Sequence, residues 1–494
     1  MMSLSKFLYK RSGDVPVRKI VIVGKVITGV LMKNVLRRLI SRFFTPARVA
    51  ARFLGLKRPV LSRPPNGLKV LIAGGYGYGN PGDEAQVAAD LEYWRNAVPD
   101  CRITMLPPDE STTEGIHGTY GIRTEIAPRV VFFNANRKPY YNRSSQRFKC
   151  RFFLLAPLLL LNARLIRAGL PVFAIPASYA RLLDVIYNSD ILFLAGGGYL
   201  TGMTLSRLWD NMLLIRLADA FGVPVILSGQ TIGVFKDRLS RLLAKWGLKK
   251  AKLIYLRDGS ASKKDLESIG IAGDKVECTF DDALFFQAAK TEEVFRVLTN
   301  NNIDTNKPYI VVNVQYWGQS SDISRSVMKQ LASAFDSIIS EFDLQMAFLP
   351  MAQVDEAAIE EVINSMQKTA FVIRYDYDFR ISVGVIKNAS LCLTMKHHPI
   401  IFAMGQGTPT ISVVLDDYYT HKNEGALRLF GQEEFLISCE PDELSQCVVE
   451  KFREAWSKRK KISKEIMRHV EELRPRAGEA IYRWLKAYNV PSGN

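Results

Sequence analysis

LCLTMKHHPIIFAMGQGTPTISVV, residues 391–414, contains the alternation on which the predicted fold rests. Short apolar runs open and close it, at 391–394 and 410–414, and a Gly-Pro break at 405–409 precedes the second run. This order is typical of a strand, a helix and a second strand. Three basic or titratable residues stand where the first strand ends and the helix begins: Lys396, His397 and His398. Ligands of open α/β sheets bind at this position, and a helix N-terminus with basic neighbours suits an anion. The alternative is a surface turn in which a histidine has only structural partners.

The same alternation recurs along most of the chain. From residue 191 onward each expected strand is followed by an expected helix, and a second series starts at residue 308. Strands at 191–195 and 223–228 are each expected to end in a glycine-rich turn, at 196–199 and 229–233. Strands joined through helices predict parallel sheets with right-handed crossovers. We therefore predict two doubly wound α/β domains facing across a cleft, with these boundaries: a basic arm at 1–66, domains at 67–290 and 291–440, and a helical segment at 441–494.

The composition describes a globular protein with an unevenly distributed charge. The 494 residues are 48% hydrophobic and 23% charged, and the net charge is +17. Residues 1–63 hold fifteen Lys or Arg and one acid, which is +14 of that total, so the rest of the chain is close to neutral. This distribution argues against nucleic-acid binding over the whole surface. The six cysteines form no CxxC pair, so neither a disulfide framework nor a metal site is expected, and a cytoplasmic location follows.

Two segments have a possible relation to membranes. Residues 36–54 mix arginine with large apolar residues, as a helix lying on anionic lipid does, and a solvated tail is the alternative. The arm therefore leaves open a peripheral position at the inner membrane face, reached through residues 1–63. The apolar run at 152–161 is too short to span a bilayer, so it predicts either a core helix or an element that dips into a membrane.

Polar and glycine residues gather at the expected strand ends of the first domain. The loop GGYGYGNPGDEA, residues 74–85, follows a strand and joins a helix that opens on Asp83 and Glu84. Such a loop suits a close ligand, but a tight turn with an acidic helix cap explains it equally well. Arg257 ends a later strand and suits either an anion or an ion pair with Asp258 or another surface acid. Asp281 and its acidic neighbour suit acid/base work, a metal, or the capping of a helix.

Six motifs, in this order, resemble those of the polysaccharide pyruvyltransferase family. They are GYGYGNPGDEA (75–85), LAGGGYL (194–200), GQTIG (229–233), LRDGSA (256–261), TFDDALF (279–285) and TMKHHPIIFAMGQGTPTI (394–411). Members of the family transfer a pyruvyl group from phosphoenolpyruvate to sugar hydroxyls as a cyclic ketal, in the synthesis of exopolysaccharides or cell-surface polysaccharides. The resemblance covers residues 68–430 approximately and excludes the basic arm.

The resemblance implies two Rossmann-like domains of the GT-B-like type and assigns roles to residues. Phosphoenolpyruvate, a co-substrate rather than a cofactor, is implied to contact Arg257, Lys396 and His398, and His398 and Asp83 are the implied proton-transfer residues. Loop or acceptor-side positions are implied for Gly79, Asn80, Gly82, Glu84, Gly197, Gly198, Gln230 and Asp281. The family commonly has Arg where this chain has Lys396, so a point charge replaces a two-pronged guanidinium. His397 falls at a variable position, which implies a structural role.

The implied partners are phosphoenolpyruvate and a sugar or lipid-linked oligosaccharide acceptor, with no nucleic acid. Two other classes of function remain open. A glycosyltransferase of the same architecture would bind a nucleotide-sugar and should place an acid near the ribose, for which the pair 416–417 is the candidate. A non-catalytic, membrane-associated scaffold of polysaccharide assembly is the third class.

Overall fold

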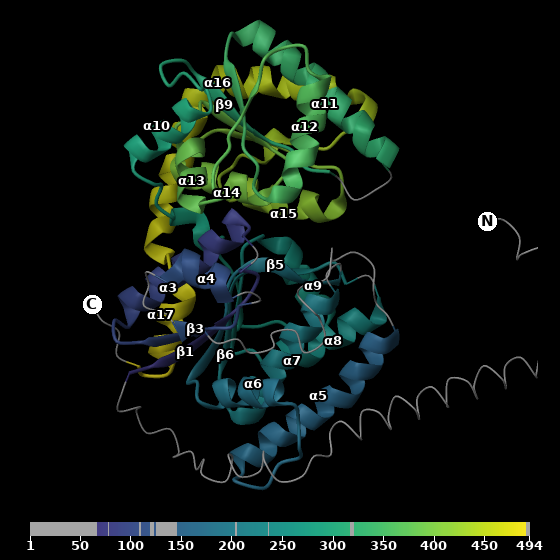
Figure 1. Cartoon of the computed structure of the whole chain (residues 1–494), viewed down its shortest axis with the longest axis vertical. Coiled ribbons are helices and arrows are strands. Elements are labelled where there is room, and N and C mark those ends of the chain that lie inside the picture. Colours follow the sequence, from purple (N-terminus) through teal and green to yellow (C-terminus); the bar gives the residue numbers. More distant parts are fainter. Residues whose placement is uncertain are drawn as a thin grey trace, which may run out of the picture.

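The computed structural model describes residues 67–77, 79–107, 110–118, 123–124, 146–202, 205–235, 237–316 and 321–490. The predicted basic arm therefore lies outside the described residues. The described chain forms two α/β domains, one above the other in Figure 1, and each is built on a parallel sheet. The predicted fold class is confirmed.

The sheet of the first domain has the strand order β3-β2-β1-β4-β6-β7-β8, and β5 pairs with β6 at one side. Its strands are β1 (Lys69–Ala73), β2 (Arg102–Met105), β3 (Arg123–Thr124), β4 (Ile191–Leu194), β5 (Gly197–Thr201), β6 (Val225–Gly233), β7 (Leu253–Leu256) and β8 (Val276–Cys278). The order reverses between β1 and β4, which is where doubly wound folds bind their ligands.

Two predicted turns of this domain are strands instead. Residues 197–201 form β5, and β6 continues through its glycines to Gly233. Glycine is uncommon within strands, which is why these segments were expected to be turns. The β5–β6 and β6–β7 pairs both shift register here, so irregular pairing keeps the glycine-rich backbone within the sheet.

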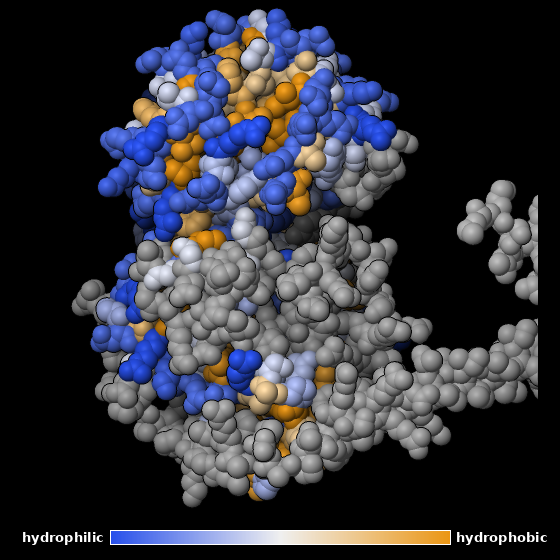
Figure 2. Space-filling model, viewed as in Figure 1, coloured by the Kyte–Doolittle hydropathy of each residue, from blue (hydrophilic) through white to orange (hydrophobic). Residues whose placement is uncertain are grey.

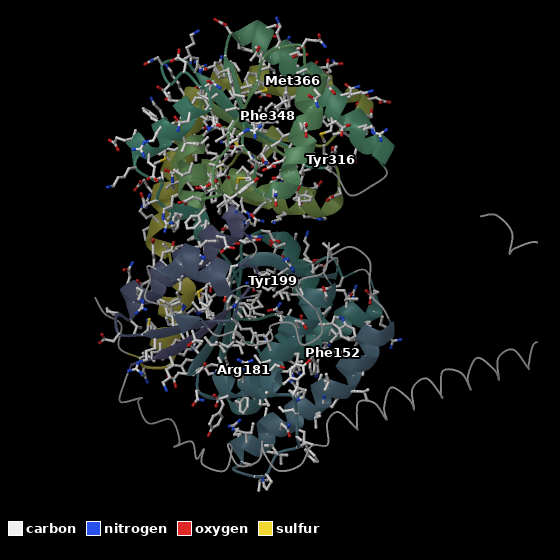
Figure 3. The ribbon with its side chains drawn as sticks, viewed as in Figure 1. Phe152, Arg181, Tyr199, Tyr316, Phe348 and Met366 are labelled. Atoms are coloured by element: carbon white, nitrogen blue, oxygen red, sulfur yellow. The ribbon has the colours of Figure 1, made fainter. Side chains whose placement is uncertain are left out.

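Helices cover both faces of the first sheet. Side chains that alternate along β1 point to opposite faces, and Leu71 packs in the core with α5, α6, α7 and α8, while Ile72 packs with α3 and α17. These helices are α3 (Pro81–Ala97), α5 (Gln146–Arg167), α6 (Ala177–Tyr187), α7 (Leu205–Phe221), α8 (Arg238–Leu248) and α17 (Glu479–Ala487), with α4 (Glu110–His117) and α9 (Ser260–Ser268) completing the domain. Tyr199 and Phe348 mark the interiors of the two domains in Figure 3.

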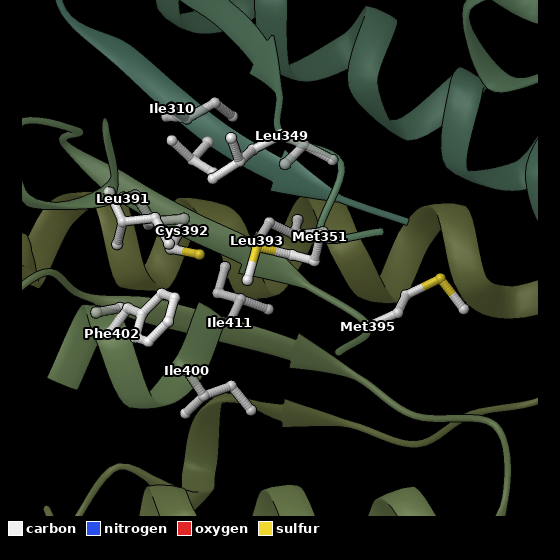
Figure 4. Packing of buried hydrophobic residues seen from close by; sticks show 14 of the residues in the cluster. Ile310, Leu349, Met351, Leu391, Cys392, Leu393, Met395, Ile400, Phe402 and Ile411 are labelled. Carbon is white, nitrogen blue, oxygen red and sulfur yellow. The ribbon is translucent and has the colours of Figure 1, made fainter. Parts of the chain in front are cut away.

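The second domain repeats the design with the order β11-β10-β9-β12-β13-β14. Its strands are β9 (Tyr309–Asn313), β10 (Gln345–Phe348), β11 (Phe371–Val372), β12 (Leu391–Thr394), β13 (Thr410–Val413) and β14 (Leu436–Ile437). Its helices are α10 (Thr291–Asn300), α11 (Ser321–Phe342), α12 (Glu356–Ser365), α13 (Phe379–Lys387), α14 (His397–Gln406) and α15 (Asp417–Arg428). The strand–helix–strand unit predicted for 391–414 is present as β12, α14 and β13, and its apolar side chains pack together in Figure 4.

The C-terminal segment is a pair of helices that connects the two domains. The long helix α16 (Leu444–Leu473) packs against α11 and α14 of the second domain. The shorter α17 returns to the first domain, where Trp484 meets Trp94 edge-on with ring centroids 6.0 Å apart. In the part of the chain that the structure describes, no helix combines the length and the apolar content that crossing a bilayer requires.

Candidate functional site

The site lies where the N-terminus of α3 in the first domain meets the N-terminus of α14 in the second. Gly82, in the first turn of α3, faces the imidazole of His398 so closely that a Cβ atom at this position would lie 2.0 Å from the His398 Cγ. Only glycine permits this approach. Each helix follows a strand at the point where its sheet reverses order, so the two crevices favoured for ligands face each other.

His398 and Asp83 face each other across the two domains. The His398 Nε2 atom is 4.0 Å from the Asp83 Oδ1 atom and 3.3 Å from the Gln86 Oε1 atom. Burial lowers the pKa of His398 well below its usual value, with the charges of Arg257 and Lys422 acting in the same direction and Asp281 opposing them. Burial raises the pKa of Asp83, against the charges of Lys422, Arg207 and Arg257. The imidazole is therefore driven toward its neutral form and the carboxyl toward its protonated form.

Arg257 stands at the carboxyl end of β7 and its side chain is fully buried. Its Nη1 atom donates to the Asp281 Oδ2 atom at 2.5 Å, and its Nε atom donates to the Thr231 Oγ1 atom at 3.0 Å. Its Nη2 atom has no hydrogen-bond partner among the described residues. Arg257 thus forms an ion pair, but its partner is the buried Asp281 and neither Asp258 nor a surface acid, and its Nη2 atom remains available for a further acceptor.

Asp281 links three elements of the site. Its Oδ1 atom accepts from the Ala283 amide at 3.0 Å, so it caps the short 3-10 helix η3 (Asp282–Phe285), as one predicted role has it. Its Oδ2 atom accepts from Arg257 and lies 3.6 Å from the His397 Nε2 atom. His397 is buried on the second domain, so Asp281 connects the two halves of the site.

Lys422 belongs to the same cluster, and sequence reasoning missed it. It lies on α15 and is 92% buried, since only 8% of its surface is exposed. Burial and the charge of Arg257 lower the pKa of Lys422 to about 7, although Asp83, Asp281 and Asp258 favour its charged form. The close packing of α15 explains the placement, because a Cβ on Gly425 would lie 2.5 Å from the Asp258 carbonyl oxygen. Residues 422 and 425 share a helix face, so the close approach of Gly425 to Asp258 also turns Lys422 toward the neighbouring Arg257.

Lys396 has a different environment from the one predicted by the resemblance. Its ammonium lies 2.5 Å from the Asp355 Oδ1 atom and donates to the Oδ2 atom at 2.7 Å. Asp355 is fully buried and also accepts from the Met351 amide at 2.9 Å. The charge of Lys396 is therefore balanced within its own domain, and Lys422 acts together with Arg257 on His398 and Asp83.

The acidic and polar residues of the glycine-rich loop divide into two groups. Glu84 accepts from the amides of Gly77 at 2.7 Å and Gly79 at 3.3 Å, and it pairs with the buried His117 at 3.0 Å. Asn80 caps α3 through the Gly82 amide at 3.1 Å. These contacts match the tight-turn interpretation of the loop, whereas Asp83 faces the site between the domains.

The remaining predicted positions shape the floor of the first domain. The Gln230 Nε2 atom donates to the carbonyl oxygens of Ala195 at 2.7 Å and Ser228 at 2.9 Å, which joins β6 to the end of β4. Gly197 has a φ of +150° and a Cβ there would lie 2.6 Å from the Tyr199 ring, so glycine is required. Gly198 follows it on β5.

A family model described as polysaccharide pyruvyl transferase matches residues 80–417 of the chain. The chain belongs to the polysaccharide pyruvyl transferase family. The resemblance stated from the six motifs is thereby confirmed, and the protein is placed among transferases of polysaccharide biosynthesis. No curated protein sequence gives a significant match to the chain.

Several solved structures have similar folds. A UDP-GlcNAc 2-epimerase from Neisseria meningitidis, solved with UDP-GlcNAc, is 13% identical, covers 85% of this chain and 100% of its own, and has a TM-score of 0.52. The S. aureus MnaA–UDP structure is 14% identical over 86% of this chain and 97% of its own, with a TM-score of 0.53. A glycosyltransferase from Rickettsia africae ESF-5 is 12% identical over 85% of this chain and 98% of its own, with a TM-score of 0.52. At these identities the likeness shows the GT-B-like fold alone.

Proposed function

We propose that this transferase moves the pyruvyl group of phosphoenolpyruvate onto two hydroxyls of a sugar, forming a cyclic ketal in exopolysaccharide or cell-surface polysaccharide synthesis. The observation that carries the proposal is the buried cluster in which Arg257 and Lys422 accompany the facing pair Asp83 and His398. Phosphoenolpyruvate carries a phosphate and a carboxylate, so its site needs two cations beside groups that transfer protons.

The proposed reaction balances as follows. One sugar hydroxyl oxygen bonds to C2 of phosphoenolpyruvate while C3 takes up a proton and becomes a methyl group. The bond from C2 to the phosphate oxygen then breaks, and phosphate leaves with the electron pair. The neighbouring hydroxyl oxygen bonds to C2 and closes the ketal. Of the two hydroxyl protons released, one balances the proton gained at C3 and the other leaves with the phosphate.

The directions of the two pKa shifts support the proton-transfer roles proposed for the facing pair. His398 is held neutral by burial and neighbouring cations, so it is suited to accept the proton of the attacking hydroxyl. Asp83 is held toward its protonated form, so it is suited to donate a proton to C3. Arg257 would bind an anionic group of phosphoenolpyruvate through its unpartnered Nη2 atom, beside the ammonium of Lys422. For Lys396 to bind the substrate as well, it would have to exchange Asp355 for it.

The acceptor in this proposal is a sugar, free or lipid-linked, and the enzyme works in the cytoplasm. Residues 1–63 would hold it at the anionic inner face of the membrane. Sedimentation with anionic vesicles, with and without these residues, tests that part separately. Equal binding of the truncated chain would remove the arm from the proposal.

Thermal unfolding in the presence of candidate donors tests the chemistry. A ligand at a hundred times its dissociation constant stabilises a protein by about 2.7 kcal/mol, which gives a readily measured rise in Tm. We expect phosphoenolpyruvate to raise the Tm of the wild type and of Arg468→Ala, an exposed control, but not of Arg257→Ala. Stabilisation by a UDP- or GDP-sugar instead would favour the glycosyltransferase alternative, and the absence of any ligand effect would favour a scaffold.

One observation weighs against the nucleotide-sugar alternative. That class needs an acid near the ribose, and the pair Asp416 and Asp417 was the candidate. The Asp416 Oδ1 atom accepts from the Tyr419 amide at 2.7 Å, so this member of the pair caps α15.

A further inference from the structure

Exposed apolar side chains gather on one part of the first domain. Among the described residues twelve large hydrophobic side chains are exposed, and five of them fall between residues 153 and 173. They are Phe153, Leu154, Leu161, Leu170 and Phe173, with exposed fractions of 41–58%. Isolated exposed apolar residues are common, whereas a group of this size marks a surface that contacts another apolar phase.

The helix α5 and the turn after it present these side chains together. Phe153, Leu161 and Arg164 follow one another at helical spacings of eight and three residues, so they share the outer face of α5. The inner face is core: Phe152, labelled in Figure 3, packs on Trp209 with ring centroids 4.5 Å apart. The core helix predicted for residues 152–161 is therefore present, but only the inner face of α5 is buried in the core.

The turn is fixed to the helix by a buried amide. Asn162 donates to the Phe173 carbonyl oxygen at 3.0 Å and accepts from the Phe173 amide at 2.9 Å. The backbone of Phe173 is thus held against α5, and Leu170 is held to the same helix because its amide donates to the Leu165 carbonyl oxygen at 2.8 Å. We call these five side chains, with Arg164 and Arg167, the α5 surface.

The sequence on either side of α5 is basic. From residue 126 to residue 183 the sequence contains ten Lys or Arg and no Asp or Glu. A pocket of about 420 Å³ lies between α5 and α7, lined by Arg164, Arg167, Arg216 and Asp219, with two alanines. Asp219 lies 3.3 Å from the Lys250 ammonium and 3.7 Å from the Arg216 Nη1 atom, so Arg164 and Arg167 give the pocket an excess of positive charge. Two such guanidinium groups at one pocket are suited to a phosphate group.

We propose that the α5 surface docks the folded body of the protein on an anionic lipid bilayer. The apolar side chains would enter the interface, and the arginine-lined pocket would take a phospholipid headgroup. An apolar face flanked by arginines matches the interface of an anionic bilayer. A purely apolar partner protein, in contrast, would leave the arginines unpaired. This inference does not depend on the pyruvyl-transfer chemistry or on the basic arm.

The position of α5 fits this role. In Figure 1 it runs along the outer edge of the first domain, on the side away from the second domain. The face of the second domain in Figure 2 shows hydrophilic side chains around scattered apolar ones. Docking through α5 would leave the site between the domains open to an acceptor.

Vesicle sedimentation of the full chain tests the proposal. Vesicles of phosphatidylcholine alone are compared with vesicles that also contain phosphatidylglycerol. Two variants change the α5 surface, Phe153→Ser/Leu161→Ser and Arg164→Gln/Arg167→Gln. Two matched controls change exposed residues elsewhere, Phe295→Ser/Val354→Ser and Lys461→Gln/Arg468→Gln. Circular dichroism and Tm confirm that each variant is folded, and Leu161→Ser alone replaces the apolar double variant if that one unfolds.

We expect the wild type to bind the anionic vesicles more tightly than the neutral ones. Each neutralised arginine should weaken binding about fivefold, since a basic residue near such a surface contributes about 1 kcal/mol. The apolar variant should lose about tenfold or more, and both controls should bind as the wild type does. Wild-type binding by both α5 variants would overturn the proposal, because the arm would then suffice. A change from dimer to monomer in these variants would also overturn it, in favour of a second copy of the chain as the partner.

Discussion

The pKa of Lys422 should give the proposed binding of phosphoenolpyruvate a specific pH dependence. In the free protein this pKa is lowered to about 7, by burial first and by Arg257 second. Only the charged ammonium attracts the anionic substrate, and its charged fraction falls from about nine tenths at pH 6 to about one tenth at pH 8. The contribution of Lys422 to phosphoenolpyruvate affinity should therefore fall about tenfold over this range.

Lys422→Met isolates this contribution, because methionine keeps an unbranched side chain and removes the charge. The dissociation constant of phosphoenolpyruvate is measured by calorimetry at pH 6, 7 and 8 for both proteins. The ratio of the two constants cancels the ionisation of the substrate itself. We expect the disadvantage of Lys422→Met to shrink about tenfold between pH 6 and pH 8. A ratio that stays constant over this range would refute the reasoning.

Protein stability without substrate gives a second readout of the same group. The folded-state pKa of Lys422 is below the unfolded value of 10.5, so the unfolded chain binds more protons between pH 7 and 10.5. The free energy of unfolding should then gain up to about 1.4 kcal/mol per pH unit from this residue as the pH rises. Lys422→Met should lose that gain, and an unchanged slope would show that the residue is not buried in this way.

Three further substitutions test the rest of the site. Gly82→Ala forces a methyl group into the imidazole of His398, so kcat/KM should fall by a hundredfold or more, on the order expected for a misplaced reacting group. The control Gly115→Ala adds a methyl group that meets nothing within 4 Å, so it should leave activity unchanged. Asp83→Asn should bind phosphoenolpyruvate but lose about a hundredfold in kcat, because it removes the proposed acid, and full turnover would make Asp83 structural only. Lys396→Met should destabilise the fold by about 3 kcal/mol, because it leaves the charge of Asp355 buried and uncompensated, and adding Asp355→Leu should recover most of that stability. Lys396→Met should also preserve the Tm rise with phosphoenolpyruvate. Loss of that Tm rise would show that Lys396 belongs to the substrate site.

Much of the fold was predictable from the sequence because parallel strands buried on both faces have a strong apolar signal. Leu391–Thr394 was expected as a strand with the bounds that the structure has, and Arg257 was expected at the end of a strand, where β7 places it. The glycine-rich β5 was predicted as a turn from the local preference of glycine. It is a strand because its pairing with β6 outweighs that preference. The pairing of β5 with β6 cannot be predicted from the local composition of residues 197–201.

The site was predictable only in part, because it is assembled between domains. Arg257, Asp83 and His398 could be nominated from motif positions, and the structure brings them into one cluster. Lys422 stands in a polar helix without a motif, and its role depends on the packing of α15 on the other domain. The pairing of Lys396 with Asp355 joins residues 41 positions apart, which no spacing rule indicates.

The opposed shifts of Asp83 and His398 also bear on the choice between the two transfer chemistries. Transfer from a nucleotide-sugar needs a base for the acceptor and cations for the leaving group. Ketal formation from phosphoenolpyruvate needs these and also an acid that protonates carbon. In this site a carboxyl with a raised pKa lies 4.0 Å from an imidazole with a lowered one, so both functions are available at one place. In the proposed reaction the acid would protonate C3 of phosphoenolpyruvate and the base would take the proton of the attacking hydroxyl, so each group has a task.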